Sequence, residues 1–184
     1  MVPNKDYWNP ERVPKVDRVI LRPIPEASAR MAAILSGQVD FVEAPSPDAI
    51  PRLESSGIEI VTNAYPHNWA IKPSRIEGSP WNDINVRKGA NLCIDREGMK
   101  QMLAGNAIPS EGHLPPGDTW FGNPDFKIGY RPDEARELMA ASGHTADNPL
   151  TVKIAISTSG SGQMQPLPMF EYLQANLAEC HFDV

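Results

Sequence analysis

The chain has 184 residues, of which 41% are apolar, and a formal net charge of -6. Its basic residues are mixed with acidic ones rather than clustered, which argues against binding to nucleic acid or to an anionic membrane surface. The length suits one sizeable domain, and 19 prolines with 13 glycines predict many irregular connections. No apolar run approaches the roughly 20 residues that span a bilayer.

The first third of the chain predicts alternating strands and helices. Residues 1–6 lack the apolar core of a signal peptide, so we expect a piece of a longer chain. Residues 17–23 and 39–43 are β-branched at their centres and predict two strands. Between them, residues 25–37 predict a helix, with an early Pro, an Ala-rich middle and a terminal Gly. This order predicts a βαβ unit with a parallel strand pair.

The middle of the chain is expected to centre on one long helix. A short helix over residues 47–55, a strand over 57–62, extended chain over 68–71 and a polar loop precede it. The long helix runs from Asp83 to about residue 103, with Asp83 as its cap. Arg87 is expected to brace the loop before this helix or to pair with a neighbouring acid.

The last third begins with a long irregular loop over residues 105–129. Trp120 and Phe121 in this loop either cap a cleft or pack against the domain, and we favour burial. A helix over residues 131–143, a strand over 150–157, a helix over 166–179 and the start of a strand at 181–184 follow. The fold class is therefore α/β, with a mixed β-sheet flanked by helices.

Cys93 and Cys180 form no C-x-x-C unit and lie far apart in the sequence. We expect two buried free thiols that pack as small apolar groups, with a disulfide between them as the alternative.

Several short motifs follow one another in a fixed order across nearly the whole chain. They are Tyr7-Trp8-Asn9-Pro10, Asp17-Arg18-Val19, Ser28-Ala29-Arg30-Met31, Leu35-Ser36-Gly37-Gln38-Val39-Asp40, Asp83-Ile84-Asn85-Val86-Arg87, Ile94-Asp95-Arg96-Glu97 and Pro132-Asp133-Glu134-Ala135-Arg136. Each motif alone is common, but their order and spacing resemble the extracellular solute-binding proteins of family 5, which serve peptide- and nickel-type ABC importers.

This resemblance implies one lobe of a type II periplasmic binding protein. Residues 1–16 would be the crossover from a missing first lobe, and residues 17–184 the C-terminal lobe, incomplete at its end. The implied function is to capture an oligopeptide, an oligosaccharide or a metal chelate and deliver it to ABC permease subunits in the membrane. The implied location is periplasmic or extracytoplasmic, with a lipid anchor as one variant, and no cofactor is implied. The alternative is the same fold used as a sensing or interaction module.

Two segments are candidates for contact with the solute. At a strand edge, His67, Asn68 and Trp69 offer an imidazole, an amide and an aromatic ring, although Trp69 would equally fill a core. Before a helix, Ser159, Gly160, Ser161, Gly162, Gln163 and Met164 form a turn that would favour an anion, or else a plain surface turn.

The sequence carries no pattern typical of an enzyme or of a metal site. It contains neither a G-x-S-x-G nor an S-x-x-K motif, and no base is marked beside Ser159 or Ser161. The histidines at positions 67, 113, 144 and 181 show no i, i+4 spacing. We therefore expect binding without catalysis.

Overall fold

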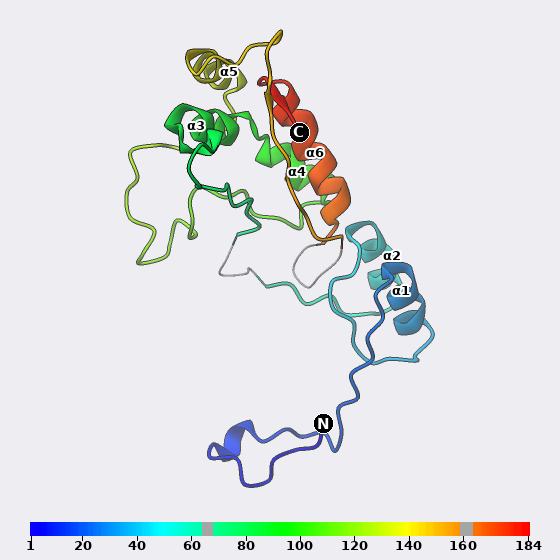
Figure 1. The fold of residues 1–184 in the computed structure, drawn as a ribbon. Coiled ribbons are helices and arrows are strands. Elements are labelled where there is room, and N and C mark those ends of the chain that lie inside the picture. Colours follow the sequence, from blue (N-terminus) through cyan, green and yellow to red (C-terminus); the bar gives the residue numbers. More distant parts are fainter. Residues whose placement is uncertain (64–67, 159–163) are drawn as a thin grey trace.

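The computed structural model describes residues 1–63, 68–158 and 164–184. In these residues no helix is long and apolar enough to cross a membrane. The elements, in chain order, are η1 (Pro10–Arg12), α1 (Ala27–Leu35), η2 (Pro47–Ala49), α2 (Ile50–Ser55), η3 (Pro80–Asn82), α3 (Ile84–Cys93), α4 (Arg96–Met102), α5 (Pro132–Ala141), β1 (Leu150–Thr151), α6 (Pro166–Ala178) and β2 (Phe182–Asp183). Figure 1 shows α3 to α6 gathered at one end, α1 and α2 beside the start of α6, and the first residues extending away.

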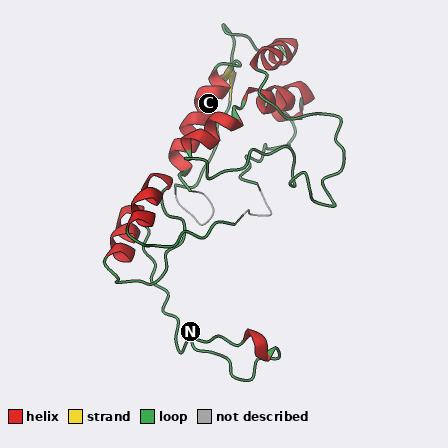
Figure 2. Ribbon diagram, turned by 180° about the vertical axis from the view of Figure 1, so that it is seen from behind, coloured by secondary structure: helices red, strands yellow, loops and turns green. Residues whose placement is uncertain are grey.

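The larger core is built by α3, α5, α6 and the two short strands. The view from behind shows these helices grouped at the end of the molecule opposite the N-terminus (Figure 2). The buried side chains that form it are Val86, Leu92, Cys93, Ala135, Met139, Leu150, Val152, Leu173, Leu177, Cys180 and Phe182.

Gly89 lets α3 approach α5 closely. A Cβ at this position would lie 3.2 Å from Cγ and Sδ of Met139 and 3.3 Å from the carbonyl oxygen of Ala135. Such separations are tighter than ordinary van der Waals contact. Glycine is a poor helix former, and its presence at position 89 is therefore explained by the close packing of α3 against α5.

A smaller core joins α1 and α2 through Met31, Ile34 and Leu53. Arg30 of α1 holds the neighbouring chain in place through its guanidinium. Its Nη1 donates to the carbonyl oxygens of Ile24 at 2.9 Å and Pro25 at 2.7 Å, and its Nη2 donates to that of Ala44 at 3.1 Å. The segments before and after α1 are thereby connected without a sheet.

The sheet of the described residues is one parallel pair, β1 and β2, with Leu150 opposite Phe182 and Thr151 opposite Asp183. The N–H of Val152 extends this pairing by donating to the carbonyl oxygen of Asp183 at 2.8 Å. Residues 152–156 continue as extended chain whose side chains alternate between inward and exposed positions. The alternation predicted for residues 150–157 is present, but only its first two residues form the strand.

The expected strands at residues 17–23, 39–43 and 57–62 are wrong, and so is the βαβ unit built on the first two. These residues are extended or irregular and carry no strand assignment. Val61, for example, is 79% exposed. A β-branched sequence favours extended backbone, but a ladder also needs a neighbouring strand, and none lies beside these described segments.

The long helix expected over residues 83–103 is two helices. α3 ends at Cys93, and α4 begins at Arg96. Ile94 and Asp95 between them have β-region backbone, with ψ values of 116° and 92°. The other predicted helices are present within a few residues of their expected bounds, because local signals such as Pro at the start and Gly after the end specify them.

Cys93 and Cys180 form a disulfide, so the expectation of two free thiols is wrong. Their Cα atoms are 6.2 Å apart, within the usual range for a disulfide, although 87 positions separate them in sequence. Both side chains are fully buried. Burial was expected correctly, but only the packing of α3 against the end of α6 places the two sulfur atoms together.

Replacing both Cys93 and Cys180 by Ala should lower the free energy of unfolding by about 2–5 kcal/mol, because the bond closes a long loop in the unfolded chain. Urea unfolding of the oxidised protein and of the double variant measures this difference. Wild-type protein whose disulfide has been reduced serves as a control and should match the variant. A difference below about 1 kcal/mol would contradict the expected stabilisation.

Candidate functional site

Asp83 caps α3, as its place in the sequence predicts. Its Oδ1 accepts from the N–H of Asn85 at 2.8 Å, and its Oδ2 accepts from the hydroxyl of Ser142 at 2.6 Å. The hydrogen bond from Ser142, followed by that from Asn85, lowers the pKa of Asp83 below its ordinary 3.8. The carboxylate thus stabilises the helix start and joins it to the residue that follows α5.

Arg87 braces the turn before its own helix, which is the first of its two expected roles. Its Nη1 donates to the carbonyl oxygens of Trp81 at 2.6 Å and Asn82 at 3.0 Å. The guanidinium therefore supplies hydrogen-bond donors to two backbone carbonyl groups of η3. The Asp83–Arg87 motif is a structural unit that sets how the chain enters α3.

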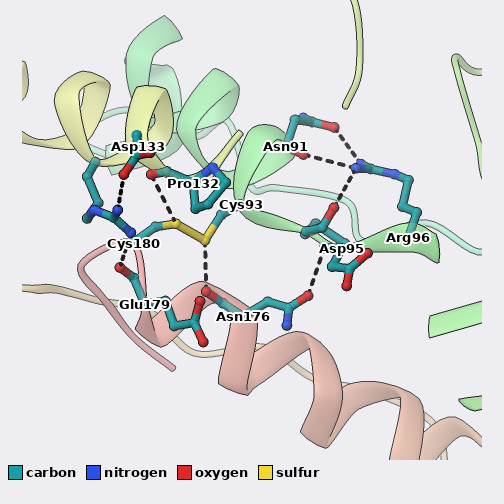
Figure 3. Close-up of a disulfide and its surroundings, with 11 residues drawn as sticks. Asn91, Cys93, Asp95, Arg96, Pro132, Asp133, Asn176, Glu179 and Cys180 are labelled. Atoms are coloured by element: carbon teal, nitrogen blue, oxygen red, sulfur yellow. Dashed lines mark hydrogen bonds and ion pairs between the residues drawn. A yellow bond between two sulfur atoms is a disulfide. The ribbon is translucent and has the colours of Figure 1, made fainter. Parts of the chain in front are cut away.

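The junction between α3 and α4, residues 94–96, is fixed from α6 (Figure 3). The backbone N–H of Asp95 donates to Oδ1 of Asn176 at 2.9 Å. The carboxylate of Asp95 accepts from the N–H of Gly98 at 2.9 Å and from the hydroxyl of Tyr172 at 3.0 Å. Burial, together with the hydrogen bond to Asp95, raises the pKa of Tyr172, so its hydroxyl stays protonated and donates. Two side chains of α6 thus hold the start of α4.

Arg96 secures the same junction from the side of α3. Its Nη1 donates to the carbonyl oxygen of Asn91 at 3.0 Å, and its Nη2 donates to Oδ1 of Asn91 at 3.1 Å. The disulfide lies on the other side of the junction, where the carbonyl oxygen of Asn176 is 2.8 Å from Sγ of Cys93 (Figure 3). The Ile94-Asp95-Arg96 motif therefore fixes backbone geometry.

Gly98 is required by the contact between Tyr172 and Asp95. A Cβ at position 98 would overlap the hydroxyl of Tyr172 and the carboxylate of Asp95. This need could not be predicted from local sequence, because it depends on Tyr172, which lies 74 positions later in the chain.

Of the residues expected to contact a solute, the structure describes Asn68, Trp69 and Met164. His67 and the residues Ser159, Gly160, Ser161, Gly162 and Gln163 lie outside the described residues. The side-chain amide of Asn68 donates to the carbonyl oxygens of Gly112 at 2.5 Å and His113 at 3.0 Å. It is therefore occupied by the protein itself, which the sequence did not indicate.

Trp69 and Met164 are both half-buried. Met164 has a positive φ of 43°, which a non-glycine residue seldom adopts. The next residue, Gln165, donates through Nε2 to Oδ1 of Asp48 at 3.3 Å, which connects the start of α6 to η2. Asn68 and Gln165, the residue after the second expected segment, thus hydrogen bond to different parts of the chain, the 112–113 backbone and η2.

Trp120 is 82% exposed, so the expected burial of this residue is wrong. Phe121 is half-buried, and a Cβ at Gly112 would lie 2.9 Å from its Cε2. The turn at residues 118–121 directs the two rings differently, because the N–H of Trp120 donates to Oδ1 of Asp118 at 2.7 Å. The loop therefore packs Phe121 inward and presents Trp120 to solvent.

An open pocket of about 340 Å³ lies between the loop before η3 and the start of the 150–157 segment. Its lining residues are Ser74, Ile76, Glu77, Gly78, Ser79, Pro80, Trp81, Thr151, Val152 and Lys153. None of them was expected to contact a solute, and neither Trp69 nor Met164 lines it. Within the described residues, no group of three or more His, Cys, Asp or Glu side chains is placed to hold a metal ion.

The chain belongs to the bacterial extracellular solute-binding proteins, family 5 middle region, whose family model matches residues 1–184. The family expected from the sequence is thereby confirmed, and the structure gives the Asp83–Arg87 and Ile94–Arg96 motifs architectural roles. The fold is that of the family 5 periplasmic binding proteins.

Three relatives illustrate the similarity. The periplasmic oligopeptide-binding protein OppA of Escherichia coli K12 is 27% identical over 164 residues, which cover 83% of this chain and 29% of that protein. A periplasmic binding protein, DppA from Helicobacter pylori in complex with the peptide STSA, matches all of this chain and 34% of its own at a TM-score of 0.74 and 24% identity. NikA from Brucella suis in complex with Fe(III)-EDTA matches 97% of this chain and 38% of its own at a TM-score of 0.70 and 20% identity. The chain therefore spans about a third of the length of these relatives.

Replacing Asp83 by Ala should lower the free energy of unfolding by about 1 kcal/mol at pH 7, through loss of the cap. Asp83→Asn should retain most of this stability, because an amide oxygen still accepts from Asn85. Because folding lowers the pKa of Asp83 below 3.8, the contribution of its charge is present above that pH and is lost as pH falls through the folded pKa. Urea unfolding from about pH 6 to about pH 2.5 should show wild type and Asp83→Asn converging in acid. A gap that widened in acid would contradict the assignment.

Gly98→Ala should destabilise the protein by about 1–3 kcal/mol through overlap with Tyr172. The sign is informative, because Gly to Ala within a helix ordinarily stabilises by up to about 1 kcal/mol. Gly117→Ala is the matched control, because a Cβ there meets nothing within 4 Å. Adding Tyr172→Phe to Gly98→Ala should recover part of the loss in thermal unfolding, and no recovery would refute the proposed overlap.

Proposed function

We propose that this chain supplies most of the C-terminal lobe of a solute-binding protein that delivers a small molecule to an ABC importer. The observation that carries the proposal is the family match over residues 1–184, supported by a TM-score of 0.74 to a peptide-bound binding protein. In this proposal residues 1–16 are the crossover from a first lobe, and residues 17–184 form the second lobe.

The proposed solute is peptide-like. OppA is an oligopeptide-binding protein, and the DppA structure holds the peptide STSA. Each shares about a quarter of its aligned residues with this chain. A metal chelate is the variant supported by the similarity to NikA bound to Fe(III)-EDTA. An oligosaccharide has no such support among these relatives.

The proposed contact surface combines His67 and Trp69 with residues 159–164. Trp69 is half-buried, and in this proposal its accessible part provides an apolar wall for the solute. The 159–164 turn precedes α6, whose N-terminal dipole favours a carboxylate such as a peptide C-terminus. The partial positive charge at the start of α6 and the aromatic ring of Trp69 together suit a short peptide.

The proposed mechanism is binding followed by closure of two lobes, without chemistry on the solute. A solute that contacts both lobes stabilises the closed arrangement and shifts the population toward it. Permease subunits in the membrane would then select the closed form. The proposed location is periplasmic or extracytoplasmic, in keeping with the periplasmic binding proteins OppA and DppA.

The test is isothermal titration of the complete two-lobed protein with dipeptides, tetrapeptides, an oligosaccharide and a nickel–histidine complex. We expect a peptide to bind with a Kd of about 10 µM or tighter. Trp69→Ala should weaken that binding at least about tenfold without shifting the Tm by more than a few degrees. Phe41→Ala, which removes an exposed aromatic ring outside the proposed contact surface, is the control and should bind as wild type does. Absence of heat with every class of solute would contradict the proposal.

A further inference from the structure

The loop over residues 110–121 is a closed unit with its own hydrogen bonds. The N–H of Asp118 donates to the carbonyl oxygen of Pro115, and that of Phe121 donates to the carbonyl oxygen of Asp118, both at 3.0 Å. These two turns return the ring of Phe121 to Gly112, where a side chain would collide with it. We call residues 110–121 the 110–121 loop.

The 110–121 loop is joined to a distant part of the chain by Asn68. The side-chain nitrogen of Asn68 donates at 2.5 Å to the carbonyl oxygen of Gly112 and at 3.0 Å to that of His113, across 44 and 45 positions. The carbonyl oxygen of Gly112 also accepts from the hydroxyl of Ser110 at 2.6 Å. Asn68 thus acts at the base of the loop, where Phe121 packs.

The loop that Asn68 holds presents Trp120 outward. The indole is 82% exposed, although its backbone N–H is fixed by Asp118. A large aromatic ring on an ordered turn is a low-entropy contact surface, because little freedom remains to be lost when it binds. Packing does not account for Trp120 in this chain, whereas it does account for Phe121.

We infer that Asn68 is a positioning residue and not a contact of the solute. Its amide donors are directed at two protein carbonyl groups, so its role is to fix the 110–121 loop beside Trp69 and to hold Trp120 in place as a contact for an apolar group of the solute. The role of Trp120 as a contact of the solute rests on the proposed function. The ordering of the loop by Asn68 is independent of that function.

The first experiment measures loop order without any solute. Hydrogen exchange of the backbone amides of residues 110–121 in the full-length protein should become roughly tenfold faster in Asn68→Ala, because two hydrogen bonds at the base are lost. In protein labelled with 5-fluorotryptophan, the resonance of Trp120, assigned with Trp120→Phe, should narrow as the loop gains motion. Asn106→Ala is the matched control, because the amide of Asn106 donates only within its own turn, to Leu103 and Ala104. If Asn68→Ala does not fold, Asn68→Asp keeps the shape and removes both donors.

The second experiment is a double-mutant cycle on the affinity for the tetrapeptide Ser-Thr-Ser-Ala. If Asn68 acts through the loop, the variant with both Asn68→Ala and Trp120→Phe should bind within about twofold of the weaker single variant. Multiplicative losses would show that Asn68 contacts the peptide itself and would overturn the inference. Unchanged hydrogen exchange and an unchanged Trp120 resonance in Asn68→Ala would overturn it as well. If the tetrapeptide does not bind to wild type, the cycle is run with whichever peptide gave heat in the titration above; if none did, the proposed function fails, while exchange and fluorine resonance still decide the role of Asn68.

Discussion

The connection between the end of α3 and the end of α6 is the constraint on which the larger core depends. The disulfide of Cys93 and Cys180 sets the distance between the two helices, and Asn176 completes the backbone hydrogen bonding where α3 stops. A helix break inside a core normally leaves polar groups without partners, which is costly. Here the N–H of Asp95 donates to Oδ1 of Asn176 in α6. The chain therefore changes direction between α3 and α4 without leaving this N–H unpaired.

The motifs that resemble the family are part of this framework. OppA is named for oligopeptides and the NikA structure holds Fe(III)-EDTA, yet both match this chain. The residues that carry the family pattern here, Asp83, Arg87, Asp95 and Arg96, all bond to the protein's own backbone or side chains. These four residues therefore support the framework from which the loops extend.

The helices could be predicted from sequence because their signals are local. Pro at the start of α5 and α6, Asp83 before α3 and Gly after α1 are each within one turn of what they specify. The strands could not, because extended segments such as residues 57–62 need a partner that local sequence does not reveal. The disulfide, the fit of Gly98 against Tyr172 and the hydrogen bonds of Asn68 share this limit, since each joins positions more than 40 residues apart. In the candidate site, the sequence indicated the aromatic and amide residues but not which of them the protein itself uses.

The buried disulfide also restricts how the protein is made. Both sulfur atoms lie inside the closed core, out of reach of any other thiol or disulfide, so the bond has to form while the chain is still open. An oxidant that meets the chain late would find no accessible thiol. Cys93 and Cys180 are the only cysteines among these 184 residues, so a single pairing is possible within this part of the protein, and it depends on oxidation before the core closes.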